Sequence, residues 1–265
     1  MTGFGGAAAS AEDLAALALT NYGHFTTLRV EGRRTRGLML HWERLGRDAR
    51  VLFGAELDLD LVRRLARERL ADGADAAGPV LARVTVFDPQ LDIARPAGVR
   101  GRSLGLRILV SVRPAPPVPL SALRVRPVEY ARVLPEVKDV GLFGAVRLRR
   151  EAQLAGFDDV LFTRSGLVAE GATWNVGFFD GSYLVRPEAP ALPGVTTALL
   201  ERAFGRFRVR PIGLADLPQM AAAFATSAGI GVRPIAAVGP VRFDPVHPVI
   251  GRLQAAYAGI AGEPV

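Results

Sequence analysis

One side chain of this sequence differs from all others in the chemistry it can perform. Lys138 is the only lysine, and the other 32 of the 33 Lys and Arg residues are arginines. A guanidinium stays protonated and cannot form an imine with a carbonyl group, whereas a lysine amine can. The segment VLPEVKDVGLFGAV (133–146) is apolar and strand-like before it enters a helix, so burial is expected to lower the lysine pKa. Lys138 is therefore either an imine-forming lysine or a remaining surface residue.

Two further segments carry the groups that pyridoxal phosphate, the usual partner of an imine-forming lysine, requires. Its pyridine nitrogen needs a carboxylate, and its phosphate needs a helix start, hydroxyl groups and an arginine. Glu170 lies in GLVAEGATWNV, where small residues flank it and a strand follows. The segment PGVTT (193–197) opens an apolar helical stretch. Taken singly, these segments are equally typical of a turn and of a helix cap.

In this order the segments resemble those of the class IV pyridoxal-phosphate enzymes. That family includes branched-chain and D-amino acid aminotransferases and aminodeoxychorismate lyase. The resemblance extends over most of the chain and rests on YGHFTTLRV (22–30), HWERL (41–45), EVKDVGLFGAVRLRREA (136–152), LVAEGATWNVGF (167–178), ALPGVTTALL (191–200) and FATSAGIGVRPI (224–235).

The resemblance implies a role for each matching residue. Lys138 would form the Schiff base with the cofactor and then act as the proton shuttle. Glu170 would pair with the pyridinium nitrogen, and Leu192 would pack on the ring face. The phosphate would be bound by Arg44, Val195 and Thr196, with Ser227 nearby. Asn175 would hold the strand that carries Glu170.

The substrate end departs from the family pattern. Phe25 stands where a tyrosine often contacts the substrate, and the bulky Trp174 precedes Asn175. We include Phe25, Trp174 and Arg95 as candidate substrate residues, with Arg83 as the alternative to Arg95 for carboxylate binding. Thr197 replaces the usual arginine, and an Ala-rich segment of helical appearance replaces the usual opening strand. We expect no metal site.

Periodicity predicts a mixed order of helices and strands in both halves of the chain. We expect strands at 25–30, 81–87, 106–112, 160–163, 175–179, 183–185, 207–209 and 222–226. We expect helices around 45–53, at 61–70 and 142–155, and from Thr196 onward. This order indicates the α+β (mixed α/β) class.

Five prolines within Val112–Val128 predict a linker between two packed units. We therefore expect a small N-terminal domain at 1–112, a linker at 113–127 and a larger, cofactor-binding C-terminal domain at 128–265. The resemblance implies the fold-type IV architecture, a small α/β domain followed by a pseudo-barrel domain.

Composition excludes several classes of protein. With 49% hydrophobic and 22% charged residues, the chain is globular rather than disordered. The absence of cysteine excludes disulfides and thiolate metal sites and is typical of a cytoplasmic protein. The longest uncharged apolar run, Leu217–Val232, is broken by proline and glycine and is too short to span a membrane.

The net charge of +7 suggests nucleic acid, but the arginines are scattered among acidic residues without a basic block or stacking aromatics. We expect no nucleic-acid partner. The excess lies in residues 1–127, where 19 arginines face 13 acidic residues. This excess of positive charge is explained either by an arginine-rich composition or by the binding of an anionic ligand.

The leading hypothesis is a pyridoxal-phosphate-dependent aminotransferase that transfers an amino group from an amino acid or amine to a keto acid. The alternative on the same site is an aminodeoxychorismate lyase that releases pyruvate, which the FTTLRV segment favours. A second alternative is a cofactor-free descendant of the fold. The resemblance also implies a homodimer.

Overall fold

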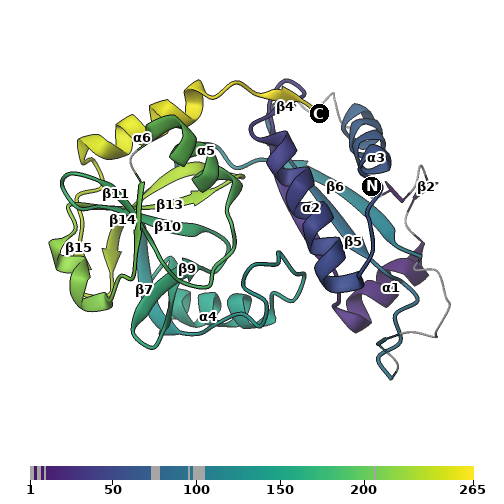
Figure 1. Ribbon diagram of the computed structural model, residues 1–265, viewed down its shortest axis with the longest axis horizontal. Helices are drawn as coiled ribbons and strands as arrows, with labels where there is room; N and C mark the ends of the chain where they lie inside the picture. The colour runs from purple at the N-terminus through teal and green to yellow at the C-terminus, as the bar shows by residue number, and fades with distance from the viewer. Residues whose placement is uncertain are drawn as a thin grey trace. The chain divides into compact units, whose positions relative to one another are not determined.

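The computed structural model describes residues 3–4, 7–8, 10–72, 78–94, 96–97, 105–205 and 207–265 of the chain. By its contacts the chain divides into two compact units (Figure 1). Unit 1 comprises Met1–Ala115, Val137–Gly141 and Gly262–Val265. Unit 2 comprises Pro116–Glu136 and Leu142–Ala261.

Unit 1 is built on a sheet with helices packed on it. The sheet order is β2-β1-β6-β5-β3, and β3, β5 and β6 pair in antiparallel fashion. The elements of unit 1 are β1 (Gly3–Phe4), β2 (Ala7–Ala8), α1 (Ala11–Thr20), β3 (His24–Val30), β4 (Arg34–Thr35), α2 (Leu38–Phe53), α3 (Leu59–Asp72), β5 (Val80–Phe87), β6 (Arg107–Pro114) and β16 (Glu263–Pro264).

Helix α2 runs between two glycines with positive φ and lies against the sheet (Figure 1). Its apolar residues recur at helical spacing, and they pack with α3 and with alternate residues of β3, β5 and β6. The helical side of this core consists of Leu38, Trp42, Leu45, Val62, Leu65, Ala66 and Leu70. The opposite face of the sheet, which carries Phe25 and Arg83, is therefore left for other contacts.

Unit 2 contains a nine-stranded sheet that curls into a half barrel. The order is β12-β11-β10-β13-β14-β7-β8-β9, and β15 pairs with β14. The elements of unit 2 are β7 (Leu123–Glu129), α4 (Phe143–Leu154), β8 (Asp159–Arg164), β9 (Leu167–Gly171), β10 (Asn175–Phe179), β11 (Leu184–Pro187), α5 (Val195–Phe204), β12 (Phe207–Arg210), the 3₁₀ helix η1 (Leu214–Gln219), β13 (Ala222–Ser227), β14 (Gly231–Val238), β15 (Val241–Arg242) and α6 (Pro248–Gly259).

The helices of unit 2 cover different parts of its sheet. Helix α4 packs on β8 and β7, whereas α5 and α6 lie side by side over β13 and β14 (Figure 1). Each packing site has its own buried cluster, and a third cluster joins β7, β8, β10, β13 and β14. Because the strands are buried beneath these clusters, they are held rigidly.

The predicted α+β class with a curled C-terminal sheet is confirmed. The unit boundaries differ from the expected domain limits. Both ends of the expected linker at 113–127 are strands: β6 ends at Pro114, and β7, which pairs with β8 and β14, begins at Leu123. The segment Val137–Gly141, expected in the C-terminal domain, belongs by its contacts to unit 1, because its backbone pairs with β3.

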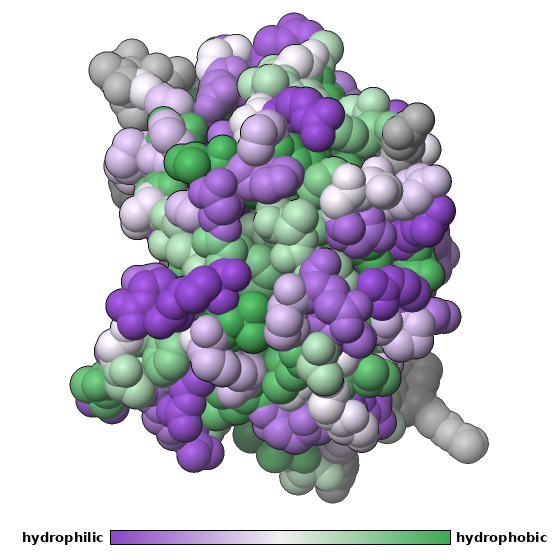
Figure 2. Space-filling model, turned by 90° about the vertical axis from the view of Figure 1, so that its left-hand side faces the viewer, coloured by the Kyte–Doolittle hydropathy of each residue, from purple (hydrophilic) through white to green (hydrophobic). Residues whose placement is uncertain are grey.

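The surface of the chain mixes polar and apolar residues. On the face that Figure 2 shows, hydrophilic side chains are spread among hydrophobic ones and do not gather in one band. Among the described residues, no helix is long and apolar enough to cross a membrane.

Candidate active site

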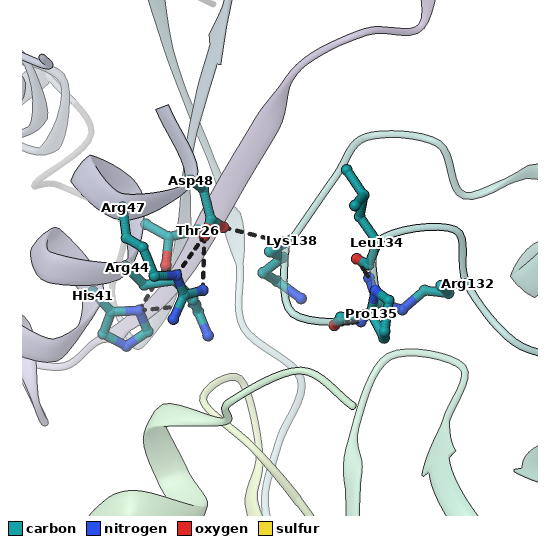
Figure 3. A network of polar contacts seen from close by, with 9 residues as sticks. All are labelled: Thr26, His41, Arg44, Arg47, Asp48, Arg132, Leu134, Pro135 and Lys138. Carbon is teal, nitrogen blue, oxygen red and sulfur yellow. Dashed lines mark hydrogen bonds and ion pairs between the residues drawn. The ribbon is translucent and has the colours of Figure 1, made fainter. Parts of the chain in front are cut away.

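Lys138 lies in an irregular segment of unit 1 whose backbone is nevertheless fixed on both sides. Its N–H donates to Oδ2 of Asp48 on α2 (3.0 Å), and its carbonyl accepts from the N–H of Phe25 on β3 (2.9 Å). The next residue, Asp139, forms a bridge with His24 of β3. The lysine thus projects from a backbone that is clamped to one helix and one strand (Figure 3).

The Lys138 side chain is half-buried and contacts an aromatic ring. Its Nζ lies 4.7 Å from the ring centroid of Phe25, and Cζ of Arg83 lies 3.6 Å from the same centroid. Burial lowers the pKa of Arg83, and the nearby Arg113 lowers it further. Phe25 therefore joins the predicted lysine to a half-buried guanidinium on the same face of the sheet.

Arg44 lies within a buried polar cluster on the other face of β3. Its Nη2 donates to Oγ1 of Thr26 (2.7 Å), and Oγ1 of Thr26 lies 2.7 Å from Nδ1 of His41 (Figure 3). The pKa of Arg44 is lowered to about 10, mainly by burial, and the nearby charge of Asp48 partly opposes this effect. The guanidinium remains a cation at neutral pH and can bind an anion.

His41 is the neutral member of this cluster. Burial lowers its pKa well below the ordinary value, and the charges of Arg44 and Lys138 add to the effect. His41 therefore lies near Arg44 and Lys138 without adding a positive charge of its own.

In unit 2, Glu170 ends β9 as a buried carboxylate. Its Oε1 accepts from Nε of Arg132 (2.9 Å), and its Oε2 accepts from the backbone N–H of Leu192 (3.0 Å). Arg132 also donates to the carbonyls of Leu134 and Pro135 (Figure 3). Both carboxylate oxygens of Glu170 therefore have a hydrogen-bond donor, as a buried polar group requires.

Asn175, at the start of β10, connects the strand to the segment before α5. Its Nδ2 donates to the carbonyl of Leu192 (2.7 Å), so both backbone groups of Leu192 are bound by predicted site residues. A Cβ on Gly194 would lie 2.0 Å from Oδ1 of Asn175, which leaves room only for glycine. Asn175 therefore holds the segment before α5, whereas the sequence led us to expect it to hold the strand that carries Glu170.

The first turn of α5 carries a buried hydroxyl beside the N-terminal end of the helix. Gly194 caps the helix without a side-chain hydrogen bond, and the buried Oγ1 of Thr196 has no partner among the described residues. Oγ1 of Thr197 is 2.8 Å from Oγ1 of Thr226 on β13. The first N–H groups of a helix have no acceptor within the helix itself, so this helix start, together with the Thr196 hydroxyl, is suited to binding an anion.

Ser227 and Trp174 border a cavity of about 470 Å³ within unit 2. Trp174 is buried, its ring packs over Gly171, and its Nε1 donates to Oδ2 of Asp159 (2.9 Å). Asp159 in turn forms a two-point ion pair with Arg149. The indole is thus fixed by packing and hydrogen bonding, and one side of it lines the cavity.

The structure brings the predicted residues together in two sets. Unit 1 holds Lys138, Arg44 and Phe25, and unit 2 holds Glu170, Leu192, Val195, Thr196, Trp174 and Ser227. Arg95 lies outside the described residues. His247 caps α6, where its Nδ1 accepts from the N–H of Val249 (3.2 Å), and its ring lies 5.5 Å from that of Phe179.

Sequence reasoning missed two charged residues. Asp48 lies one helical turn after Arg44, and Arg132 precedes Lys138 by six positions. The only local signal for Asp48 was its position at i+4 from Arg44 on the same helix face. Arg132 had none. Among the described residues no group of three or more His, Asp and Glu side chains is placed to hold a metal ion.

The sequence matches the model of a known protein family. The family model described as amino-transferase class IV matches residues 23–238. No curated protein matches the sequence.

Solved structures share the fold at low sequence identity. The pyridoxal-phosphate-bound ("PLP-bound") form of a hypothetical aminotransferase from Mycobacterium tuberculosis is 21% identical, with coverage of 97% of this chain and 98% of that chain and a TM-score of 0.80. A branched-chain aminotransferase from the thermophilic archaeon Thermoproteus uzoniensis, solved with norvaline, is 17% identical, with coverage of 97% and 93% and a TM-score of 0.81. A putative 4-amino-4-deoxychorismate lyase from Legionella pneumophila is 22% identical, with coverage of 92% and 93% and a TM-score of 0.75.

Proposed function

Because the chain belongs to the class IV aminotransferase family, we propose that it is a pyridoxal-phosphate-dependent aminotransferase. It would transfer an amino group from an amino acid or amine to a keto acid. The observation that carries the proposal is the start of α5, where the buried hydroxyl of Thr196 has no hydrogen-bond partner among the described residues. The same short segment contains Leu192, whose N–H donates to Glu170.

The residues of unit 2 fit the phosphate and the pyridine ring. Unsatisfied N–H groups and the Thr196 hydroxyl at the start of α5 are suited to a phosphate dianion. The Glu170 carboxylate is suited to a protonated ring nitrogen, and Leu192, fixed through both backbone groups, would pack on the ring. When bound, the cofactor supplies an electron sink for negative charge at the substrate carbon.

The residues of unit 1 fit the remaining roles. Lys138 would bind the cofactor covalently through Nζ, and after release the same amine would move the proton at the substrate carbon. Arg44 remains charged and would neutralise part of the phosphate charge. Its hydrogen bond to Thr26 holds the guanidinium in one orientation.

Arg83 is the residue we propose for the substrate carboxylate. Its guanidinium is half-buried against Phe25, the ring that Nζ of Lys138 also contacts. Among the described residues it has no carboxylate partner, and burial lowers its pKa. An anionic substrate would relieve this cost, so amino acids are favoured over simple amines.

The test is a spectral half-reaction. The purified protein is mixed with pyridoxal phosphate, and the absorbance of bound cofactor is followed on addition of L-amino acids, D-amino acids and the matching amines without a carboxylate. We expect the wild type to bind the cofactor and Lys138→Ala to lose this binding. Glu136→Ala, an exposed substitution two residues away, should retain it. A wild-type protein that binds no cofactor would instead identify the chain as a non-catalytic descendant of the fold.

Lyase chemistry on the same site is the alternative that the likeness to the Legionella protein and the FTTLRV segment favour. Release of pyruvate from aminodeoxychorismate without an amino acceptor would establish it, and dependence of turnover on a keto acid would establish transamination. A homodimer and a cytoplasmic location complete the proposal, and we propose neither a nucleic-acid nor a membrane partner.

A further inference from the structure

Asp48 is a buried carboxylate without a role in the reaction proposed above. Its side chain is 1% exposed. Burying a carboxylate is costly unless hydrogen bonds and opposite charges compensate for the lost water. The partners of Asp48 therefore indicate what the residue does.

The two carboxylate oxygens have different partners. Oδ1 accepts from Nη2 (2.7 Å) and Nε (3.1 Å) of Arg47, the half-exposed neighbour on α2. Oδ2 accepts from the backbone N–H of Lys138 (3.0 Å), which is 90 positions away in sequence (Figure 3). Arg47 compensates the charge, and the second oxygen is left to hold the lysine segment.

Asp48 completes the fixation of Lys138. The segment around the lysine has no regular helix or strand of its own, and β3 holds the lysine carbonyl through the N–H of Phe25. Asp48 supplies the acceptor for the lysine amide, on the other side of the same residue. We propose that Asp48 is a positioning residue that fixes the backbone of Lys138 and hence the origin of its side chain.

The same helix also positions Arg44. His41, Arg44 and Asp48 recur at i, i+3 and i+7 and form one polar stripe on α2 beside its apolar stripe. One rigid element thus sets the positions of the lysine backbone and of the guanidinium proposed for the phosphate. The functional part of this inference rests on the proposed function, but the structural part does not.

The single lysine makes the hydrogen bond directly observable. Selective ¹⁵N-lysine labelling of the full chain gives one backbone amide signal, that of Lys138. We expect a downfield proton shift and slow solvent exchange in the wild type. Asp48→Ala should move the proton upfield and speed exchange about tenfold or more, because a charge-assisted bond is lost. Asp48→Asn, which keeps an oxygen acceptor, should lie between the two.

The second readout is the split between kcat and KM in the cofactor-loaded protein. Asp48→Ala should lower kcat about tenfold or more with KM nearly unchanged, because a misplaced amine slows proton transfer without weakening substrate binding. Asp48→Asn should recover most of kcat. This rescue by an uncharged acceptor separates positioning from a general loss of stability.

Two control variants complete the experiment. Arg47→Ala removes the partner of Oδ1 only and should leave the Lys138 amide signal in place. Asp58→Ala removes the oxygen that accepts from the N–H groups of Asp60 and Leu61 at the start of α3. It should lower the unfolding midpoint of the same unit without moving the signal.

An unmoved Lys138 amide in Asp48→Ala, or a kcat equal to that of the wild type, overturns the proposal. If Asp48→Ala does not fold, Asp48→Asn decides: an upfield shift supports the positioning role, and an unchanged shift overturns it. A wild type that binds no pyridoxal phosphate overturns the proposed function instead, and the amide signal still tests the hydrogen bond.

Discussion

Glu170 is a buried carboxylate whose two oxygens are both hydrogen-bonded. The carboxylate is held by Arg132 and by the N–H of Leu192, so its two oxygens point in fixed directions. The ion pair with Arg132 offsets the cost of removing the carboxylate from water. An oriented carboxylate is what a protonated ring nitrogen requires.

Replacing Glu170 by Gln should therefore impair catalysis more than folding. The amide keeps an oxygen for the N–H of Leu192 but loses the charge. We expect kcat/KM for the half-reaction to fall roughly tenfold to hundredfold, the effect of losing a hydrogen bond to a charged group. Stopped-flow absorbance of the bound cofactor measures this.

The matched control for Glu170→Gln is Glu201→Gln in the same unit. It breaks the half-exposed ion pair of Glu201 with Arg186 and should leave the half-reaction unchanged. Equal rates for Glu170→Gln and the wild type would refute the assignment of Glu170 to the ring nitrogen.

At the scale of elements, the first turn of α5 contains two threonines with opposite surroundings. Thr196 has a buried hydroxyl without a partner among the described residues, and Thr197 shares a hydrogen bond with Thr226. Their comparison separates ligand binding from helix attachment, because both substitutions by valine preserve side-chain shape.

Thr196→Val should weaken pyridoxal phosphate binding about tenfold without lowering the free energy of unfolding, because the hydroxyl contributes only to the ligand. Thr197→Val should instead lower the free energy of unfolding by about 1 kcal/mol. Fluorescence titration and urea denaturation measure the two quantities. Unchanged affinity in Thr196→Val would argue against a phosphate at this helix start.

Helix α2 shows what periodicity predicts and what it leaves out. Of the apolar stripe predicted from spacing, Leu45 packs into the core of unit 1 and Ala49 is buried, whereas Leu52 and Phe53 are only partly buried. The polar stripe of His41, Arg44 and Asp48 was not recognised as a unit, because hydrophobic spacing identifies the buried face of a helix only when that face is apolar.

At the scale of the whole chain, buried imidazoles make folding depend on pH. His24 is completely buried, neither ring nitrogen has a hydrogen-bond partner among the described residues, and burial lowers its pKa to about 4. His41 shifts in the same direction. The folded protein therefore keeps both imidazoles neutral under mildly acidic conditions.

Acidification should destabilise the protein for this reason. An unfolded imidazole titrates near pH 6.5, so between about pH 6.5 and 4 only the unfolded chain takes up the proton on His24. Linkage gives a loss of about 2 kcal/mol in the free energy of unfolding between pH 7 and 5 from this residue.

Urea denaturation at the two pH values measures the loss. His24→Leu should flatten the dependence, leaving the part due to His41, whereas His247→Asn, which keeps an acceptor at the start of α6, should not. If His24→Leu leaves the pH dependence of the unfolding free energy unaltered, His24 is not its source.

Local patterns sufficed for much of the molecule. The strands at 25–30, 81–87, 160–163, 175–179 and 222–226 and the helices that contain Leu45 and Leu142–Ala155 were predicted to within a few residues, because alternation and helical spacing are properties of neighbouring residues. The single lysine and the motifs around Glu170 and Thr196 also identified the family, since each motif is contiguous.

The tertiary structure decided which groups hold these residues in place. The acceptor for the Lys138 amide is 90 positions away, and the guanidinium on Glu170 is 38 positions away. The Lys138 segment belongs by its contacts to unit 1, because its backbone hydrogen bonds are made with β3 and with Asp48. Such partners leave no periodic trace in the sequence, since a hydrogen bond requires proximity in space and not along the chain.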